Sequence, residues 1–142
     1  MIKNKDSRLL DEVCSVGKLE DYRETLRYIF LLINESGCKV STRYDVGYSN
    51  INDSVENGSH IRISLVAVQY PLDIIWKLLH EYGHFLSGKR QPTDSTIYRE
   101  ELAWKYADEL LERYPELVIH KDAYERCKEE CLISYRRKFS HE

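Results

Sequence analysis

The chain has 142 residues, of which 42% are hydrophobic and 32% are charged, and its formal net charge is −3. This length suits one domain with a real core, and the composition excludes the disordered and fibrous classes. Because the net charge is slightly negative, no overall field favours nucleic acid or an anionic membrane. We therefore expect a single domain over residues 1–142, with neither nucleic acid nor a membrane as its partner.

Targeting signals and cross-links are not expected from the sequence. The longest apolar run, residues 29–33, is far shorter than the roughly 20 residues that span a bilayer. The first fifteen residues carry Asp6, Asp11 and Glu12 and lack an apolar stretch followed by a cleavage site, which favours a cytoplasmic location. A chain of this size does not need disulfides, so free thiols are expected at Cys14, Cys38, Cys127 and Cys131.

The first half of the chain predicts a helix followed by strands. Apolar residues recur with helical spacing over residues 19–34, and Gly37 follows as a helix-ending glycine. Residues 38–48 and 60–68 alternate like strands, whereas residues 49–59 are polar turn material. We expect two or three strands in a short antiparallel sheet, and the second predicted strand is a candidate to bind extended substrate along a free edge.

The second half predicts three helices. Pro71 begins the first, which runs to about residue 87, where Gly88 ends it. The second runs to about residue 113, and the third covers about residues 122–138. The candidate caps of the second helix are Asp94, Ser95 and Thr96. Strands followed by a run of helices indicate the α+β class.

The first of these helices contains an HExxH motif, formed by His80, Glu81 and His84. Residues four apart lie on one helix face, so the two imidazoles can share one metal ion. Zinc in a catalytic site takes a third protein ligand and keeps a position for water, and Glu81 is placed to accept the proton of that water. The helix is apolar around most of its surface, and buried His and Glu need partners or a metal. The alternative is two hydrogen-bonded core histidines.

The third ligand is expected on the next helix. Ser87 and Arg90 occupy the positions where a metzincin has Gly and His, so that class is excluded. Glu100 shares the apolar face of the second helix with Ala103, whereas Glu101 aligns with charged residues. We expect Glu100 to point inward as a ligand, although an acidic residue also suits a first helical turn without any metal.

The connection between the two helices supports this assignment. Because a loop of about eight residues joins the two helices, we expect them to be antiparallel neighbours, with His84 and Glu100 at the same level. The small side chains of Ala103 and Ala107 then let the two helices approach closely.

Over about residues 60–112 the chain resembles the ImmA/IrrE family of small zinc metallopeptidases. The resemblance rests on HEYGH followed by E-x-x-A-x-x-Y-A-x-x-L-L, here Glu100, Ala103, Tyr106, Ala107, Leu110 and Leu111. It implies a zincin-like fold with the HExxH helix packed on the glutamate-bearing helix, zinc held by His80, His84 and Glu100, and Glu81 as catalytic base. Members commonly act in bacteria and mobile elements and cleave a regulatory protein, such as a helix-turn-helix repressor. Trp104 stands where members often have Asn.

The resulting hypothesis is a zinc-dependent metallopeptidase of gluzincin type that cleaves a protein or peptide. Such enzymes also use a donor that stabilises the oxyanion, and Tyr98, Tyr106 and His120 are candidates among which the sequence does not choose. Two alternatives remain open: a zinc-binding domain without catalysis, and a metal-free helical interaction module or small toxin/antitoxin component.

Overall fold

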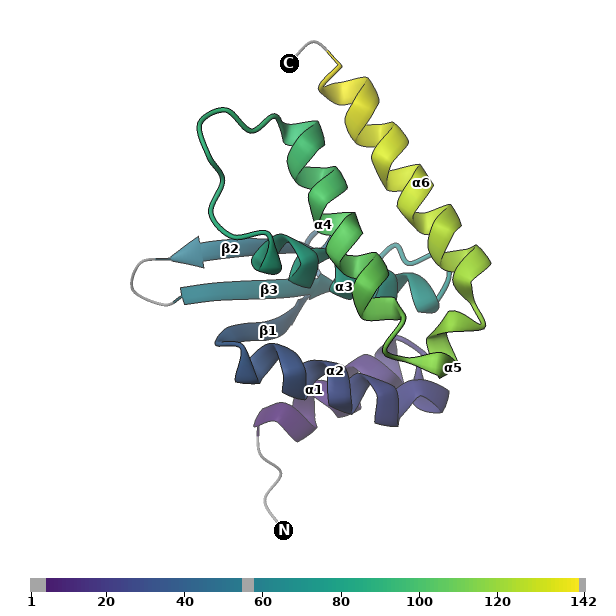
Figure 1. The fold of residues 1–142 in the computed structure, drawn as a ribbon. Helices are drawn as coiled ribbons and strands as arrows, with labels where there is room; N and C mark the ends of the chain where they lie inside the picture. The colour runs from purple at the N-terminus through teal and green to yellow at the C-terminus, as the bar shows by residue number, and fades with distance from the viewer. Residues whose placement is uncertain (1–4, 55–57, 141–142) are drawn as a thin grey trace. The chain divides into compact units, whose positions relative to one another are not determined.

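The computed structural model describes residues 5–54 and 58–140, whose course Figure 1 shows. The described residues form six α-helices, one short 3₁₀ helix and one three-stranded sheet, so the expected α+β class is confirmed. The chain divides into two compact units, Met1–Leu78 and Leu79–Glu142, and helix α3 (Leu72–Leu86) passes from one to the other. All four predicted site residues therefore belong to the second unit.

Two helices, α1 (Lys5–Val16) and α2 (Arg23–Glu35), are joined by the 3₁₀ turn η1 (Glu20–Tyr22). The helix predicted over residues 19–34 is α2 with this turn before it, and Gly37 follows with a φ of +89°, as a helix-ending glycine does. Helix α1 is not among the helices predicted from the sequence. Its buried apolar side chains are Leu10, Val13 and Cys14.

The sheet is mixed rather than antiparallel. Strands β1 (Cys38–Arg43), β2 (Asn50–Ser54) and β3 (Gly58–Ser64) lie in the order β1-β3-β2. β1 runs parallel to β3, whereas β2 runs antiparallel to it. The expectation of an antiparallel sheet is therefore wrong for β1. It failed because β2, which lies inside the segment assigned to turns, pairs with β3 and leaves β1 to pair on the other side.

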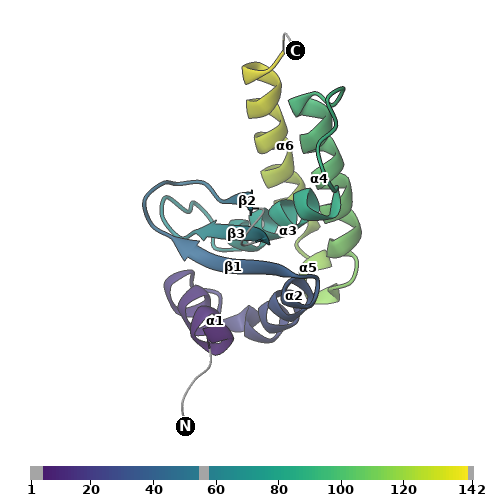
Figure 2. The ribbon, with the colours of Figure 1, turned by 90° about the vertical axis from the view of Figure 1, so that its left-hand side faces the viewer.

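β3 lies in the middle of the sheet, with Ile61 paired to Val40 on one side and to Ile51 on the other. Ile61 and Ile63 are fully buried, which confirms the alternation predicted for this strand. The expectation that this strand offers substrate a free edge is wrong, because both of its edges already carry a partner strand. Helices α1 and α2 pack beside β1 in the same unit (Figure 2).

The second unit contains the end of α3, then α4 (Thr96–Leu111), the short helix α5 (Pro115–Val118) and α6 (Lys121–Lys138). The three predicted helices are thus confirmed. Of the candidate caps, Ser95 is the one that caps α4, because its hydroxyl accepts a hydrogen bond from the backbone N–H of Tyr98 at 3.0 Å.

Helices α4 and α6 run side by side in opposite directions (Figures 1 and 2). Near the end of α4, Asp108 accepts a 2.6 Å hydrogen bond from the Tyr124 hydroxyl and pairs with the Lys128 ammonium at 2.9 Å. Near its beginning, Glu101 pairs with Arg136 at 3.4 Å. These contacts fix which residues of the two helices lie opposite each other.

Two further expectations concern cysteines and membranes. All four cysteines are free thiols, as predicted, and burial raises the pKa of Cys38 to about 11. Among the described residues, no helix is both long enough and apolar enough to cross a bilayer.

Candidate metal centre

Helix α3 presents the HExxH residues from a largely buried stretch. His80 and Glu81 are 6% and 8% exposed, and the His84 side chain is 18% exposed, so the cluster opens toward solvent at His84. Pro71 precedes the helix and Asp73 lies in its first turn, where a negative charge is favourable. The apolar residues between Asp73 and His80 bury this part of the helix.

Helix α4 supplies the carboxylate that the helical phase predicts. Glu100 is 5% exposed, whereas the side chain of its neighbour Glu101 is 51% exposed. The orientation of the two glutamates is therefore as predicted, while the chemical roles of the site residues stay predictions.

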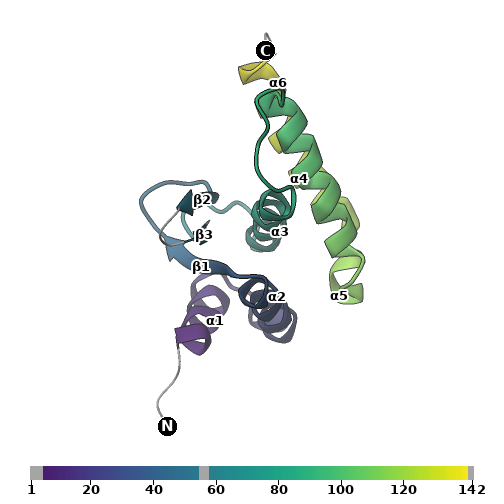
Figure 3. The same cartoon turned by 60° about the vertical axis from the view of Figure 1, so that its left-hand side comes forward.

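The end of α3 approaches α4 closely but crosses it. Figure 3 views α3 nearly along its axis while α4 lies across the view, so these helices are not the antiparallel neighbours expected from the loop length. A Cβ atom on Gly83 would lie 2.2 Å from the backbone oxygen of Ala103, well inside van der Waals contact. Gly83, inside the HExxH motif, is therefore the residue that permits the close approach, together with the predicted small residue Ala103.

This approach brings three potential ligands together. Nε2 of His80 lies 2.8 Å from Oε2 of Glu100, and Nε2 of His84 lies 3.0 Å from Oε1 of the same carboxylate. The two imidazole rings have centroids 4.6 Å apart and meet edge to face. One donor atom from each of the three residues lies within 4.8 Å of the others, so the group can hold a metal ion.

The hydrogen bonding within the cluster fits that use. Oε2 of Glu100 is buried and has no hydrogen-bond partner among the described residues, although Nε2 of His80 is 2.8 Å away. The two atoms therefore face the same space without a hydrogen bond between them. A buried carboxylate oxygen without a hydrogen-bond partner is energetically costly. A cation bound by Oε2 of Glu100 and Nε2 of His80 would compensate this cost.

The protonation state also suits a cation. Burial lowers the pKa of His80, which keeps its ring neutral at neutral pH. Burial alone would raise the pKa of Glu100, but its interactions with His80 and His84 outweigh burial and lower the pKa of this carboxyl to about 2. An ionised carboxylate and a neutral imidazole are the forms that bind metal.

Trp104 supports the site from the next turn of α4. Its indole ring stacks on the His80 ring, with centroids 4.3 Å apart and an interplanar angle of 20°. On its other side it meets Tyr124 of α6 edge to face at 5.7 Å. Trp104 is only 1% exposed, so it fixes the His80 ring and connects it to α6.

Two further residues lie near the ligand cluster: Glu81, and Tyr135, which the sequence analysis did not identify as a candidate. Oε2 of Glu81 lies 4.0 Å from Nε2 of His80. The half-buried Tyr135 of α6 has its pKa raised by burial, by the charges of Glu100 and Glu81 and by hydrogen bonding to Glu100. The Tyr135 phenol therefore lies near the carboxylates of Glu100 and Glu81. Only the packing of α6 on α4 shows this, because no local motif marks the residue.

The three tyrosine and histidine candidates from the sequence are less favourably placed. Tyr98 is 51% exposed. Tyr106 lies six residues after Glu100, about 240° around the helix from it. His120 precedes α6 at the end where that helix meets the last turns of α4, whereas Glu100 lies near the start of α4.

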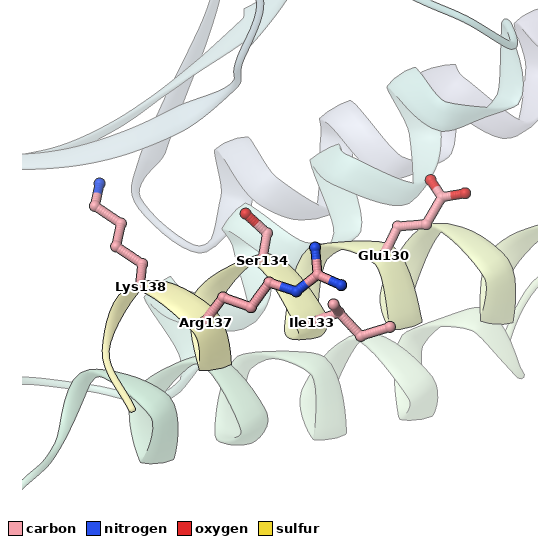
Figure 4. Close-up of a pocket in the computed structure, with 5 residues that line it drawn as sticks. All are labelled: Glu130, Ile133, Ser134, Arg137 and Lys138. Atoms are coloured by element: carbon pink, nitrogen blue, oxygen red, sulfur yellow. The ribbon is translucent and has the colours of Figure 1, made fainter. Parts of the chain in front are cut away.

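An open depression of about 510 Å³ lies along an exposed face of α6 (Figure 4). The residues that line it are Glu130, Ile133, Ser134, Arg137 and Lys138. They share one helix face, and Ser134 directly precedes Tyr135. The depression is therefore a surface feature of α6, and none of the candidate ligands lines it.

Comparisons with protein-family models, with curated proteins and with solved structures gave no match for this chain. The geometry of the cluster is therefore the basis for assigning a function.

Proposed function

We propose that the protein is a zinc metallopeptidase that cleaves a protein or peptide. The observation that carries the proposal is the convergence of His80, His84 and Glu100 around one point, with Glu81 beside the first ligand. Two imidazoles and one carboxylate are a ligand set of catalytic zinc sites, which keep an open position, whereas structural zinc sites usually have four protein ligands. When bound, zinc would acidify water and polarise the scissile carbonyl.

The residues of the chain then have separate tasks. His80, His84 and Glu100 would hold the ion, and the Trp104 ring keeps His80 in its orientation. Glu81 takes a proton from water as the oxygen of that water attacks the carbonyl carbon. It then gives the proton to the amine nitrogen as the C–N bond breaks. The partial exposure of His84 leaves one side of the site accessible to substrate.

The resemblance to the ImmA/IrrE family supports a regulatory protein, such as a helix-turn-helix repressor, as the substrate. The protein would then act in the cytoplasm.

Metal content tests the ligands. We expect elemental analysis of the purified protein to find about one zinc per chain. Glu100→Gln and His84→Ala should each lower zinc affinity strongly, because either change removes a donor. Glu101→Gln is the matched control for Glu100, since it removes the adjacent but exposed carboxylate. Zinc binding that survives the first two changes would show that the cluster is only a pair of core histidines bonded to a glutamate.

Cleavage tests the catalytic base. A library of quenched fluorescent peptides serves as the probe, and Glu81→Gln should retain zinc but reduce the cleavage rate by about 10²- to 10⁴-fold. Glu109→Gln, an exposed carboxylate on α4, is the control. A zinc-loaded wild-type protein that cleaves nothing, or a Glu81→Gln variant as active as wild type, would favour the non-catalytic zinc-binding alternative.

A further inference from the structure

The register between α4 and α6 determines which side chain of α6 faces the candidate centre. Asp108 contacts Tyr124 and Lys128, and Glu101 contacts Arg136. Residues later in α4 therefore lie opposite residues earlier in α6, as in an antiparallel pair of helices. In such an antiparallel register the part of α6 that lies opposite Glu100 is residues 132–137, which include Tyr135.

The face of α6 that turns toward α4 includes the same residue. Tyr124, Cys127 and Leu132 are buried, and Tyr135 lies three helical turns after Tyr124, at nearly the same angle around the helix. The Tyr135 ring is held from behind by Phe139, on which it stacks with centroids 5.8 Å apart. The helix face and the register therefore place Tyr135 on the side of α6 that turns toward α4, near the level of Glu100.

Burial raises the pKa of Tyr135, and the charges of the Glu100 and Glu81 carboxylates raise it further, so both carboxylates lie near this phenol. A scissile carbonyl must lie within reach of the ligands and of the base at once, so a hydroxyl near both Glu100 and Glu81 is a candidate to reach its oxygen. The hydroxyl of a tyrosine is protonated at neutral pH and can donate one hydrogen bond. Among the residues described in this unit, Tyr135 is the phenol placed at both the ligand Glu100 and the base Glu81.

We propose that Tyr135 is the oxyanion donor of this site, donating a hydrogen bond to the carbonyl oxygen as that oxygen gains negative charge. The assignment rests on the proposed peptidase function. The phenol gives up no proton in this role: the transferred proton moves from water to Glu81 and then to the leaving amine.

The test compares Tyr135→Phe with wild type and with Tyr114→Phe. Phe keeps the ring that packs on Phe139, so the fold is retained. Tyr114 is the matched control, because it is also half-buried in this unit but the groups that act on it are Arg113, Tyr82 and Glu116 rather than the site residues. We expect Tyr135→Phe to lower kcat by about 100- to 1000-fold with little change in KM, because a lost oxyanion donor weakens the transition state only.

Two readouts that do not depend on turnover separate this role from others. Zinc affinity, measured by competition with a chromophoric chelator, should be the same for Tyr135→Phe and wild type. A phosphinate analogue of the best-cleaved peptide, whose anionic oxygens imitate the charged carbonyl oxygen, should bind Tyr135→Phe more weakly by about the factor lost in kcat/KM.

Each contrary result has a distinct meaning. Wild-type kcat in Tyr135→Phe, or an equal loss in Tyr114→Phe, overturns the assignment of Tyr135 but leaves the peptidase intact. A loss of zinc affinity of about 10- to 100-fold, with kcat restored at saturating zinc, also overturns it, because Tyr135 would then act only by orienting Glu100. A wild-type protein without peptidase activity removes the proposed function, and the assignment of Tyr135 falls with it.

Discussion

At the scale of single residues, the candidate centre depends on side chains that bind no metal as much as on the ligands. His80 is held between the Glu100 carboxylate at 2.8 Å and the Trp104 ring at 4.3 Å. Its Nδ1 is buried without a hydrogen-bond partner among the described residues. Ring stacking rather than a hydrogen bond at Nδ1 therefore fixes the orientation of this imidazole, whereas metal-binding histidines more often use such a hydrogen bond.

Replacing Trp104 tests this dependence. Trp104→Ala should lower the free energy of unfolding by about 3–5 kcal/mol, because it empties a large buried site, and it should weaken zinc binding by releasing the His80 ring. Trp104→Phe should be milder in both respects. It keeps an aromatic face against His80, and the indole N–H that it removes has no hydrogen-bond partner among the described residues. Denaturant unfolding and chelator competition measure the two effects, and equal zinc affinity in all three proteins would contradict the stacking argument.

At the scale of elements, the site depends on how closely α3 and α4 approach. Gly83→Ala should destabilise the protein even though alanine favours a helix by about 1 kcal/mol over glycine. The added methyl group would meet the Ala103 backbone oxygen at 2.2 Å, so the helices must separate, at a cost of about 1–3 kcal/mol above that gain. Because His84 and Glu100 lie on opposite sides of this contact, zinc affinity should fall as well.

Gly88→Ala is the matched comparison for Gly83→Ala. Gly88 has a φ of +74° and no atom within 4 Å of an added Cβ, so alanine there strains the backbone without separating α3 from α4. It should therefore lower thermal stability and leave zinc affinity unchanged. If Gly83→Ala bound zinc as tightly as Gly88→Ala, the close approach of the helices would not matter for the site.

The polar contact at the far end of α4 should contribute stability without affecting the metal. Tyr124→Phe removes the 2.6 Å hydrogen bond to Asp108 and should cost about 1 kcal/mol, since Asp108 keeps Lys128 and remains accessible to water. Urea unfolding of Tyr124→Phe, Asp108→Ala and the double variant gives the coupling between these groups. Additive losses would mean that the hydrogen bond contributes nothing to stability.

At the scale of the whole molecule, the parts predicted from sequence are those governed by local periodicity. Helical phase alone distinguishes buried Glu100 from exposed Glu101, and glycines mark the ends of α2 and α3. Pairings between distant segments were not predictable. β2 has no buried residue among its described side chains, so no alternation marks it, and its pairing with β3 made the sheet mixed. Tyr135 reaches Glu100 only through the register of α6 on α4.

The division into two units gives the final prediction, which concerns where zinc stabilises the chain. All three ligands lie in the second unit, and zinc at 100 times its dissociation constant adds about 2.7 kcal/mol to the stability of any state that retains the site. Openings that separate the end of α3 from α4 must release the ion, whereas local openings in the sheet need not. Hydrogen exchange should therefore slow mainly in residues 79–86 and 96–111 when zinc is added, and His84→Ala should abolish the effect. Equal slowing in β1 and β3 would contradict this prediction, because it would mean that both units open together as the single cooperative domain expected from the length of the chain.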